Sequence, residues 1–203
     1  MYWIGITFDP TTIKTEPITE NAQYEGIRIR FLGTLGTARH HMQIDVGFGD
    51  VVYPKPVAMD FPVILDFPAP RMLCYSRESA IAEKLEAMVQ WDMLNSRMKD
   101  FYDIWLLSRQ FDFDGHELAE AIRRTFVQRS TPLPRMVPAF TKLFVDNKQV
   151  QWTNFHDRLK QEHVPASFAD IVASIAEFLS PVIAAVTSGD SGPTRWTASG
   201  PWT

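Results

Sequence analysis

The chain has 203 residues, of which 45% are hydrophobic and 22% are charged. This length and composition are typical of one large or two small globular domains with a buried core. The formal net charge of −4 argues against a general nucleic-acid-binding protein, because such domains are usually basic throughout.

The lack of a recognisable signal peptide or membrane-spanning segment and the single cysteine favour a cytoplasmic protein. We find no run of about eighteen consecutive apolar residues, and we therefore expect no membrane-spanning helix. The sequence start, MYWIGITFDP, lacks the basic and apolar regions of a signal peptide. The single cysteine, Cys74, has no second cysteine in the chain to pair with, which fits a reducing compartment.

The N-terminal third predicts β-strands. Residues 26–31 alternate apolar and basic side chains, and residues 41–48 alternate apolar and polar ones, as half-buried strands do. A Gly-Thr-Leu-Gly turn between them favours an antiparallel hairpin. Residues 1 to about 23 show no clear period. Five prolines in residues 51–73 favour an extended connector, with one edge strand at residues 63–67.

From Ser76, a candidate helix N-cap, the apolar residues recur at helical spacing. The pattern predicts helices in the following ranges: two within 75–109, then 115–129, 138–145, 155–159, and a long helix at 167–186 capped by Ser167. Residues 146–154 have the composition of a polar turn. The final segment is rich in Gly, Ser, Thr and Pro and predicts a disordered tail.

Together these elements predict an α+β protein, with a small antiparallel sheet followed by a helical bundle. We expect a β portion in residues 1–73, a helical domain in residues 74–187 and a disordered tail in residues 188–203.

Some charged positions have both a structural and a functional interpretation. Asp45 lies on the polar face of its predicted strand, where Gly47 and Gly49 leave room for a ligand. Asp45 is therefore either a solvent-facing aspartate or a functional carboxylate, and the residues alone favour neither. Four arginines, at positions 123, 124, 129 and 135, form either a solvated helix end or a phosphate-binding rim.

Two helical motifs carry a family resemblance. Glu83-Lys84-Leu85 is followed sixteen residues later by Lys-Asp-Phe-Tyr-Asp at 99–103. This pair resembles the AbiEii/AbiGii-type nucleotidyltransferase toxins, which are minimal members of the DNA polymerase β-like nucleotidyltransferase fold. The resemblance extends upstream to residues 43–50 and, more weakly, downstream to residues 176–181.

The resemblance implies a toxin of a toxin–antitoxin pair that transfers a nucleoside monophosphate from an NTP to an acceptor such as tRNA. It implies NTP and Mg²⁺ as cofactors, and a cognate antitoxin as partner. Lys84 would contact the nucleotide's phosphates, with Arg97 and Lys99 adding positive charge. Asp100 would orient Lys84 or accept the proton of the attacking hydroxyl, and Asp45 would support the metal site as a catalytic carboxylate.

The resemblance also implies a Gly-Gly or Gly-Ser turn and an Asp-x-Asp strand ahead of residues 26–31. The 25 residues before that strand contain neither motif. We therefore expect an incomplete metal site. The alternative function is that of a non-catalytic, truncated remnant that binds a partner protein or nucleotide. If the family site is present, the Asp45, Lys84 and Asp100 side chains should lie within roughly 10 Å of one another.

Overall fold

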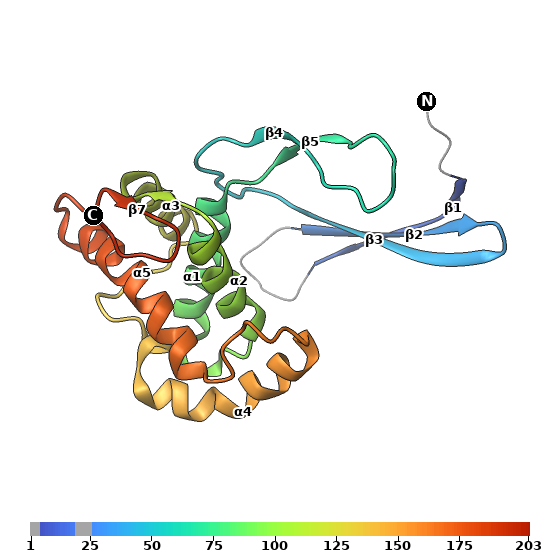
Figure 1. Cartoon of the computed structure of the whole chain (residues 1–203). Helices are drawn as coiled ribbons and strands as arrows, with labels where there is room; N and C mark the ends of the chain where they lie inside the picture. The colour runs from blue at the N-terminus through green and yellow to red at the C-terminus, as the bar shows by residue number, and fades with distance from the viewer. Residues whose placement is uncertain (1–4, 19–25) are drawn as a thin grey trace. The chain divides into compact units, whose positions relative to one another are not determined.

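A computed structural model describes residues 5–18 and 26–203 (Figure 1). The protein combines helices with small antiparallel sheets, which confirms the predicted α+β class. The chain forms two compact units, Met1–Asp50 and Val51–Thr203. The division that we expected between residues 73 and 74 falls inside the second unit.

The first unit is a three-stranded antiparallel sheet in the order β1-β2-β3. The strands are β1 (Ile6–Pro17), β2 (Gly26–Leu35) and β3 (Ala38–Gly47). The predicted hairpin is therefore confirmed as β2 and β3, which are joined by a tight turn with Gly36 at a positive φ of 58°. Strand β1 was not predicted, because its polar residues show no alternation.

The second unit begins with an exposed hairpin of β4 (Val57–Asp60) and β5 (Arg71–Cys74). The edge strand that we expected at residues 63–67 is wrong, since these residues lie in the connection between β4 and β5. Their apolar side chains are largely exposed, and Ile64 is fully so. A short apolar run thus resembled a strand although its side chains are about half or more exposed.

Most of the second unit is helical. The elements are α1 (Arg77–Trp91), η1 (Asp92–Leu94), α2 (Met98–Gln110), β6 (Phe113–Asp114), α3 (Gly115–Gln128), η2 (Pro138–Phe140), α4 (Lys142–Leu159), α5 (Phe168–Ser188) and β7 (Arg195–Trp196). Two predicted N-caps are confirmed: the Ser76 and Ser167 hydroxyls accept hydrogen bonds from the third backbone N–H that follows each of them.

Helix α4 is longer than the sequence predicted. The expected polar turn at residues 146–154 is wrong, because these residues continue the helix. The buried side of α4 carries Phe144, Lys148 and Trp152, which are spaced four residues apart. Lys148 is only 8% exposed, and its ammonium group lies 5.6 Å from the centre of the Phe144 ring. A lysine in the middle of the apolar stripe concealed the helical period.

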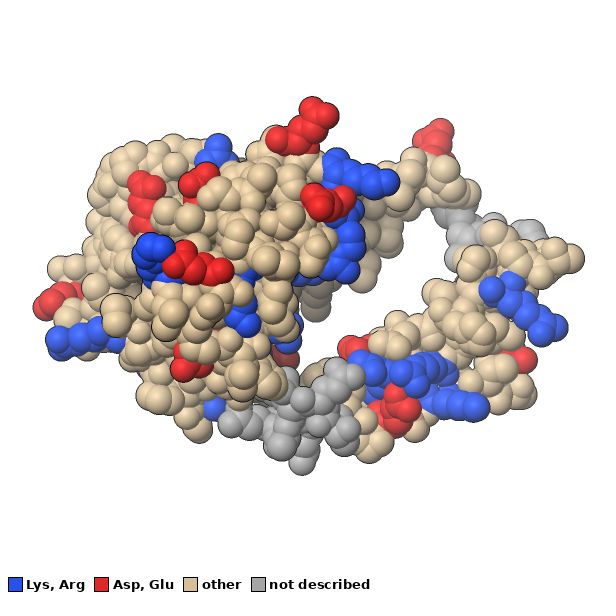
Figure 2. All heavy atoms as spheres, turned by 90° about the horizontal axis from the view of Figure 1, so that it is seen from below, with Lys and Arg blue, Asp and Glu red and all other residues tan. Residues whose placement is uncertain are grey.

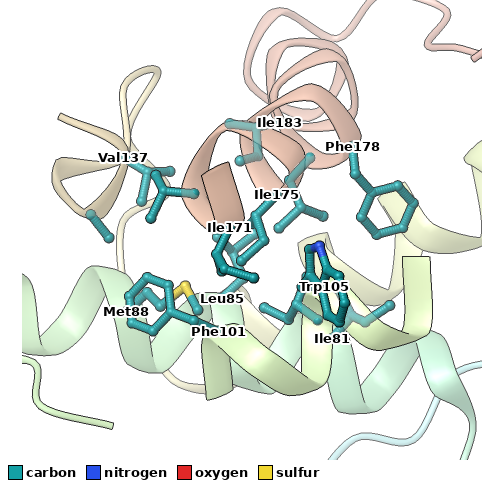
Figure 3. Close-up of a cluster of buried hydrophobic side chains, with 14 of the residues drawn as sticks. Ile81, Leu85, Met88, Phe101, Trp105, Val137, Ile171, Ile175, Phe178 and Ile183 are labelled. Atoms are coloured by element: carbon teal, nitrogen blue, oxygen red, sulfur yellow. The ribbon is translucent and has the colours of Figure 1, made fainter. Parts of the chain in front are cut away.

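Helix α5 is the central helix of the core and packs against α2, α3 and α4. Figure 3 shows its Ile171, Ile175 and Phe178 among side chains from α1 and α2, such as Leu85 and Trp105. By length and composition alone, α5 is apolar enough to span a membrane. Eight of its residues are buried in the second unit, so its apolar surface is used in the core.

The C-terminal segment differs from the predicted disordered tail. Strand β7 pairs with β6, and the Trp196 indole N–H donates to the Ser108 carbonyl over 2.6 Å. The Trp202 indole N–H donates to the Phe178 carbonyl over 2.8 Å, and the two rings stack with centres 5.6 Å apart. Two tryptophans supply the apolar area that orders a segment otherwise rich in Gly, Ser and Pro.

Candidate functional site

Lys84 of α1 faces α2 and binds two aspartates there. Its ammonium Nζ lies 2.9 Å from Oδ1 of Asp100 and 2.8 Å from Oδ2 of Asp103. The two aspartates are three residues apart and therefore project from the same side of α2. The Asp100 side chain is 5% exposed, whereas that of Lys84 is 22% exposed. The two halves of the recognised sequence motif thus meet in space.

Two further cations extend this network toward solvent. Arg97 donates from Nε to Oδ2 of Asp100 over 2.6 Å, and Lys99 donates from Nζ to Oδ2 of Asp103 over 2.6 Å. Their side chains are 57% and 72% exposed. We call these five residues, Lys84, Arg97, Lys99, Asp100 and Asp103, the α1–α2 charge cluster. Three cations against two carboxylates leave it with a net charge of +1.

Local backbone structure fixes the cluster. Asn95, which is buried, accepts a hydrogen bond from the Arg97 backbone N–H over 2.8 Å and donates to the Ala87 carbonyl over 3.4 Å. These bonds tie the connection between the helices to α1. Asp100 lies in the first turn of α2, where a carboxylate is favourable because of the helix dipole. The turn therefore sets where the cluster's charges lie.

The Lys84 ammonium is protonated at neutral pH. Burial lowers its pKa, but hydrogen bonds to Asp103 and Asp100 outweigh that effect and raise the pKa above its ordinary value. A fixed, partly buried ammonium with its charge retained suits contact with an anionic group such as a phosphate.

Asp45 lies in the first unit and is held by Arg28, its cross-strand neighbour. Arg28 donates from Nε to Oδ1 and from Nη2 to Oδ2, each over 2.9 Å, which is a bidentate pair. These hydrogen bonds lower the pKa of the Asp45 carboxyl. The pairing was missed at the sequence level, because the hairpin was predicted without a register; in the structure the register of β2 and β3 places the two residues opposite each other.

The donor set does not fit a magnesium site. Among residues 5–18 and 26–203, no group of three or more His, Cys, Asp or Glu side chains is placed to hold a metal ion. Asp45, the predicted metal ligand, has both oxygens bonded to Arg28. Its convergence with Lys84 and Asp100 stays a prediction, because Asp45 belongs to the other compact unit.

The predicted arginine group serves mainly in internal ion pairs. Arg123 and Arg124 both bind Glu120 on α3, at 2.7 and 2.6 Å. Arg129 binds the buried Glu86 of α1 at 2.7 Å. On the face seen in Figure 2, basic and acidic side chains are interspersed rather than gathered by sign. These contacts favour the structural interpretation of that helix end over a phosphate-binding rim.

A cavity of about 490 Å³ opens beside the α1–α2 charge cluster. The first residues of α2 and the second half of α4 form its walls. The lining residues are Ser96, Arg97, Met98, Lys99, Asp100, Gln151, Asn154, Phe155 and Arg158.

A family model described as nucleotidyl transferase AbiEii toxin, type IV TA system, matches residues 2–174. The chain belongs to this family. No curated protein and no solved structure matched it. The match spans the motifs at 83–85 and 99–103, so the α1–α2 charge cluster lies within the AbiEii region. The resemblance stated from those motifs is thereby confirmed.

Proposed function

We propose that this AbiEii-family protein acts in nucleotidyl transfer, from an NTP to an acceptor such as tRNA, and that the α1–α2 charge cluster binds the phosphates of the NTP. The observation that carries the proposal is the double ion pair of Lys84 with Asp100 and Asp103. It assembles the two motif halves into one site with a fixed ammonium group.

In this proposal each charged residue of the cluster has a distinct role. Lys84 contacts phosphate oxygens as a compact point charge, and the more exposed Arg97 and Lys99 add attraction from the solvent side. Both oxygens of Asp100 accept hydrogen bonds from cations, one from Lys84 and one from Arg97. This arrangement supports Asp100 as the residue that orients Lys84, rather than as a proton acceptor.

The family implies magnesium as well as NTP, but the described residues offer no fitting set of ligands. We therefore assign phosphate binding to this chain and assign no step to a metal ion. The catalytic role predicted for Asp45 is weakened by its pairing with Arg28, which occupies both carboxylate oxygens.

The bidentate Arg28–Asp45 pair favours a second candidate function. In that case the protein is a non-catalytic member of the family that binds a nucleotide or a partner protein. Strand-borne carboxylates that hold magnesium need free oxygens, and those of Asp45 are already bonded.

The family belongs to type IV toxin–antitoxin systems, so a cognate antitoxin is implied. We infer a cytoplasmic location and no membrane association. The burial of α5 in the core supports this, since its apolar side chains contact other helices of the unit.

One experiment tests the proposal and separates the two candidates. ATP affinity and transfer of label from α-³²P-labelled NTPs to tRNA are measured for the wild type and for Lys84→Ala. Lys142→Ala is the matched control, since Lys142 is exposed and its one ion pair among the described residues is with Asp146 of its own helix. If the wild type transfers label and the Lys84→Ala variant does not, the protein is a nucleotidyltransferase that depends on Lys84. ATP binding without transfer favours the second candidate, and a failure to bind ATP contradicts both nucleotide-binding roles.

A further inference from the structure

The cavity beside the α1–α2 charge cluster carries an inference that rests on the proposed function and deepens it. We propose that Arg158 of α4 is a phosphate-binding residue, and that this cavity holds a phosphate-bearing ligand between Arg158 on one wall and Arg97 and Lys99 on the other. No sequence motif marks Arg158, because it lies 55 residues after Asp103, in a helix that the apolar pattern only partly reveals.

The charges of the cavity wall favour an anion. Three cationic side chains, Arg97, Lys99 and Arg158, line it against one carboxylate, that of Asp100. This local excess of positive charge occurs in a chain whose net charge is −4. The cations of the cluster are themselves paired, Lys84 and Arg97 with Asp100 and Lys99 with Asp103. With Arg158 added, four cations stand against two carboxylates, so an entering phosphate meets a net charge of +2.

Arg158 is both oriented and available. Its Nε donates to the backbone carbonyl of Asn154 over 3.0 Å, one turn earlier in α4. That bond fixes the guanidinium group and leaves its Nη atoms for a ligand. Among the residues that the structure describes, no carboxylate lies within ion-pair distance of Arg158. An arginine held in this way presents paired donors that match the geometry of phosphate oxygens.

The remaining wall residues suit a nucleotide. Gln151 and Asn154 bring amide groups, which both donate and accept hydrogen bonds. Phe155 adds aromatic surface, and its ring is fixed against Trp152 and Tyr102, with ring centres 5.5 and 6.0 Å apart. A volume of about 490 Å³ lies in the range of small-molecule sites.

Two sources supply the same phosphate chemistry: the triphosphate of the NTP and the phosphodiester backbone of the RNA acceptor. The test therefore uses three probes with the full chain, namely inorganic tripolyphosphate, ATP and a single-stranded octauridylate. Affinities are measured by calorimetry at low salt for the wild type, Arg158→Ala and Arg158→Lys. Arg135→Ala is the matched control, since it removes an exposed arginine of the same unit that does not line the cavity.

We expect Arg158→Ala to weaken binding about tenfold, as loss of one charged hydrogen-bonding group does, and Arg158→Lys to restore part of it. Arg135→Ala should change affinity by less than about twofold. A loss confined to tripolyphosphate and ATP identifies the nucleotide as the ligand, and a loss confined to octauridylate identifies the acceptor.

Equal affinities of Arg158→Ala and Arg135→Ala for all three probes, with the wild type binding normally, would overturn the inference and leave the proposed function standing. If the wild type bound none of the three probes, that result would contradict the proposed function, and the proposal for Arg158, which rests on it, would fail too. The two failures are therefore distinguishable in one series of measurements.

Discussion

The carboxylate of Asp100 accepts a hydrogen bond of 2.9 Å from the ammonium group of Lys84, which lies sixteen residues earlier in the chain. The bond joins α1 to α2 at a place where the carboxylate is almost completely buried. It thus combines a structural role with the proposed functional one, and the two roles are separable by experiment.

We expect Asp100→Asn to lower the free energy of unfolding by about 1–3 kcal/mol, because a buried charged partner of Lys84 and Arg97 is lost. Urea unfolding followed by tryptophan fluorescence measures this change. Five of the six tryptophans lie in Val51–Thr203, so the signal reports mainly the second unit. Asp146→Asn, which breaks an exposed pair with Lys142, should cost less than about 0.5 kcal/mol. Equal costs for the two variants would contradict a structural role for Asp100.

ATP binding should depend on charge rather than on magnesium. Lys84→Ala should weaken ATP affinity about tenfold, whereas Asp45→Asn should change it by less than about twofold, because the Asp45 carboxylate is bonded to Arg28. The affinity should fall as salt rises and should survive EDTA. Titration calorimetry at two salt concentrations, with and without EDTA, checks this. Loss of binding in EDTA would show that a metal site exists after all.

Glu120 should give the second unit an acid-sensitive contribution to stability. Hydrogen bonds from Arg123, supported by Arg124, lower the pKa of Glu120 from 4.5 to about 2. The folded protein therefore binds this proton more weakly than the unfolded chain does. The stabilisation is present above pH 4.5 and is lost as pH falls from 4.5 toward 2. Because the side chains of Arg123 and Arg124 are 54% and 44% exposed, solvent screens these pairs and we expect only about 1 kcal/mol.

Unfolding free energies at pH 6 and pH 3 test this expectation for the wild type and Glu120→Gln. The variant should lose less stability than the wild type between the two pH values. Glu117→Gln, on the same helix but without an arginine partner among the described residues, should behave as the wild type does. A Glu120→Gln variant with the full wild-type acid sensitivity would show that another group is responsible.

The C-terminal tryptophans should stabilise the second unit. Trp202→Ala removes a ring stacked on Phe178 and an indole hydrogen bond, so we expect a loss of about 2 kcal/mol in the free energy of unfolding. Trp91→Ala, which removes a ring that is 36% exposed, should cost less. Urea unfolding followed by circular dichroism compares the two. If Trp202→Ala left the free energy of unfolding unchanged, that result would support the original prediction of a disordered tail.

Strands with regular apolar–polar alternation, and helices that begin at a capping serine, were predictable from the sequence. Strands β2 and β3 follow clean alternation, and α1 and α5 begin at serines that cap them. Helix α4 was broken in two because its buried stripe includes Lys148. The C-terminal segment was wrongly predicted to be disordered because most of its residues are Gly, Ser, Thr and Pro. The two tryptophans that order it bind Ser108 and Phe178, which lie far away in the sequence.

The candidate site was predictable only as far as its motifs extend. Lys84 and Asp100 stand in recognised motifs, and the structure brings them together. Asp103 ends the second motif and was given no role in the site at the sequence level, yet it lies as close to Lys84 as Asp100 does. Arg28 and Arg158 carry no motif: the first depends on strand register, and the second on how α4 packs beside α2. Contacts of that kind are set by tertiary structure, which no local pattern encodes.

The burial of α5 has a practical consequence for work on this protein. The family match ends at residue 174, whereas Phe178, Leu179, Val182 and Ile183 lie beyond it and are fully or almost fully buried. An expression fragment cut at the family boundary would keep the charge cluster but expose the apolar surfaces that these side chains cover. Such a fragment should aggregate, and its inactivity would then be mistaken for evidence about the chemistry of the site.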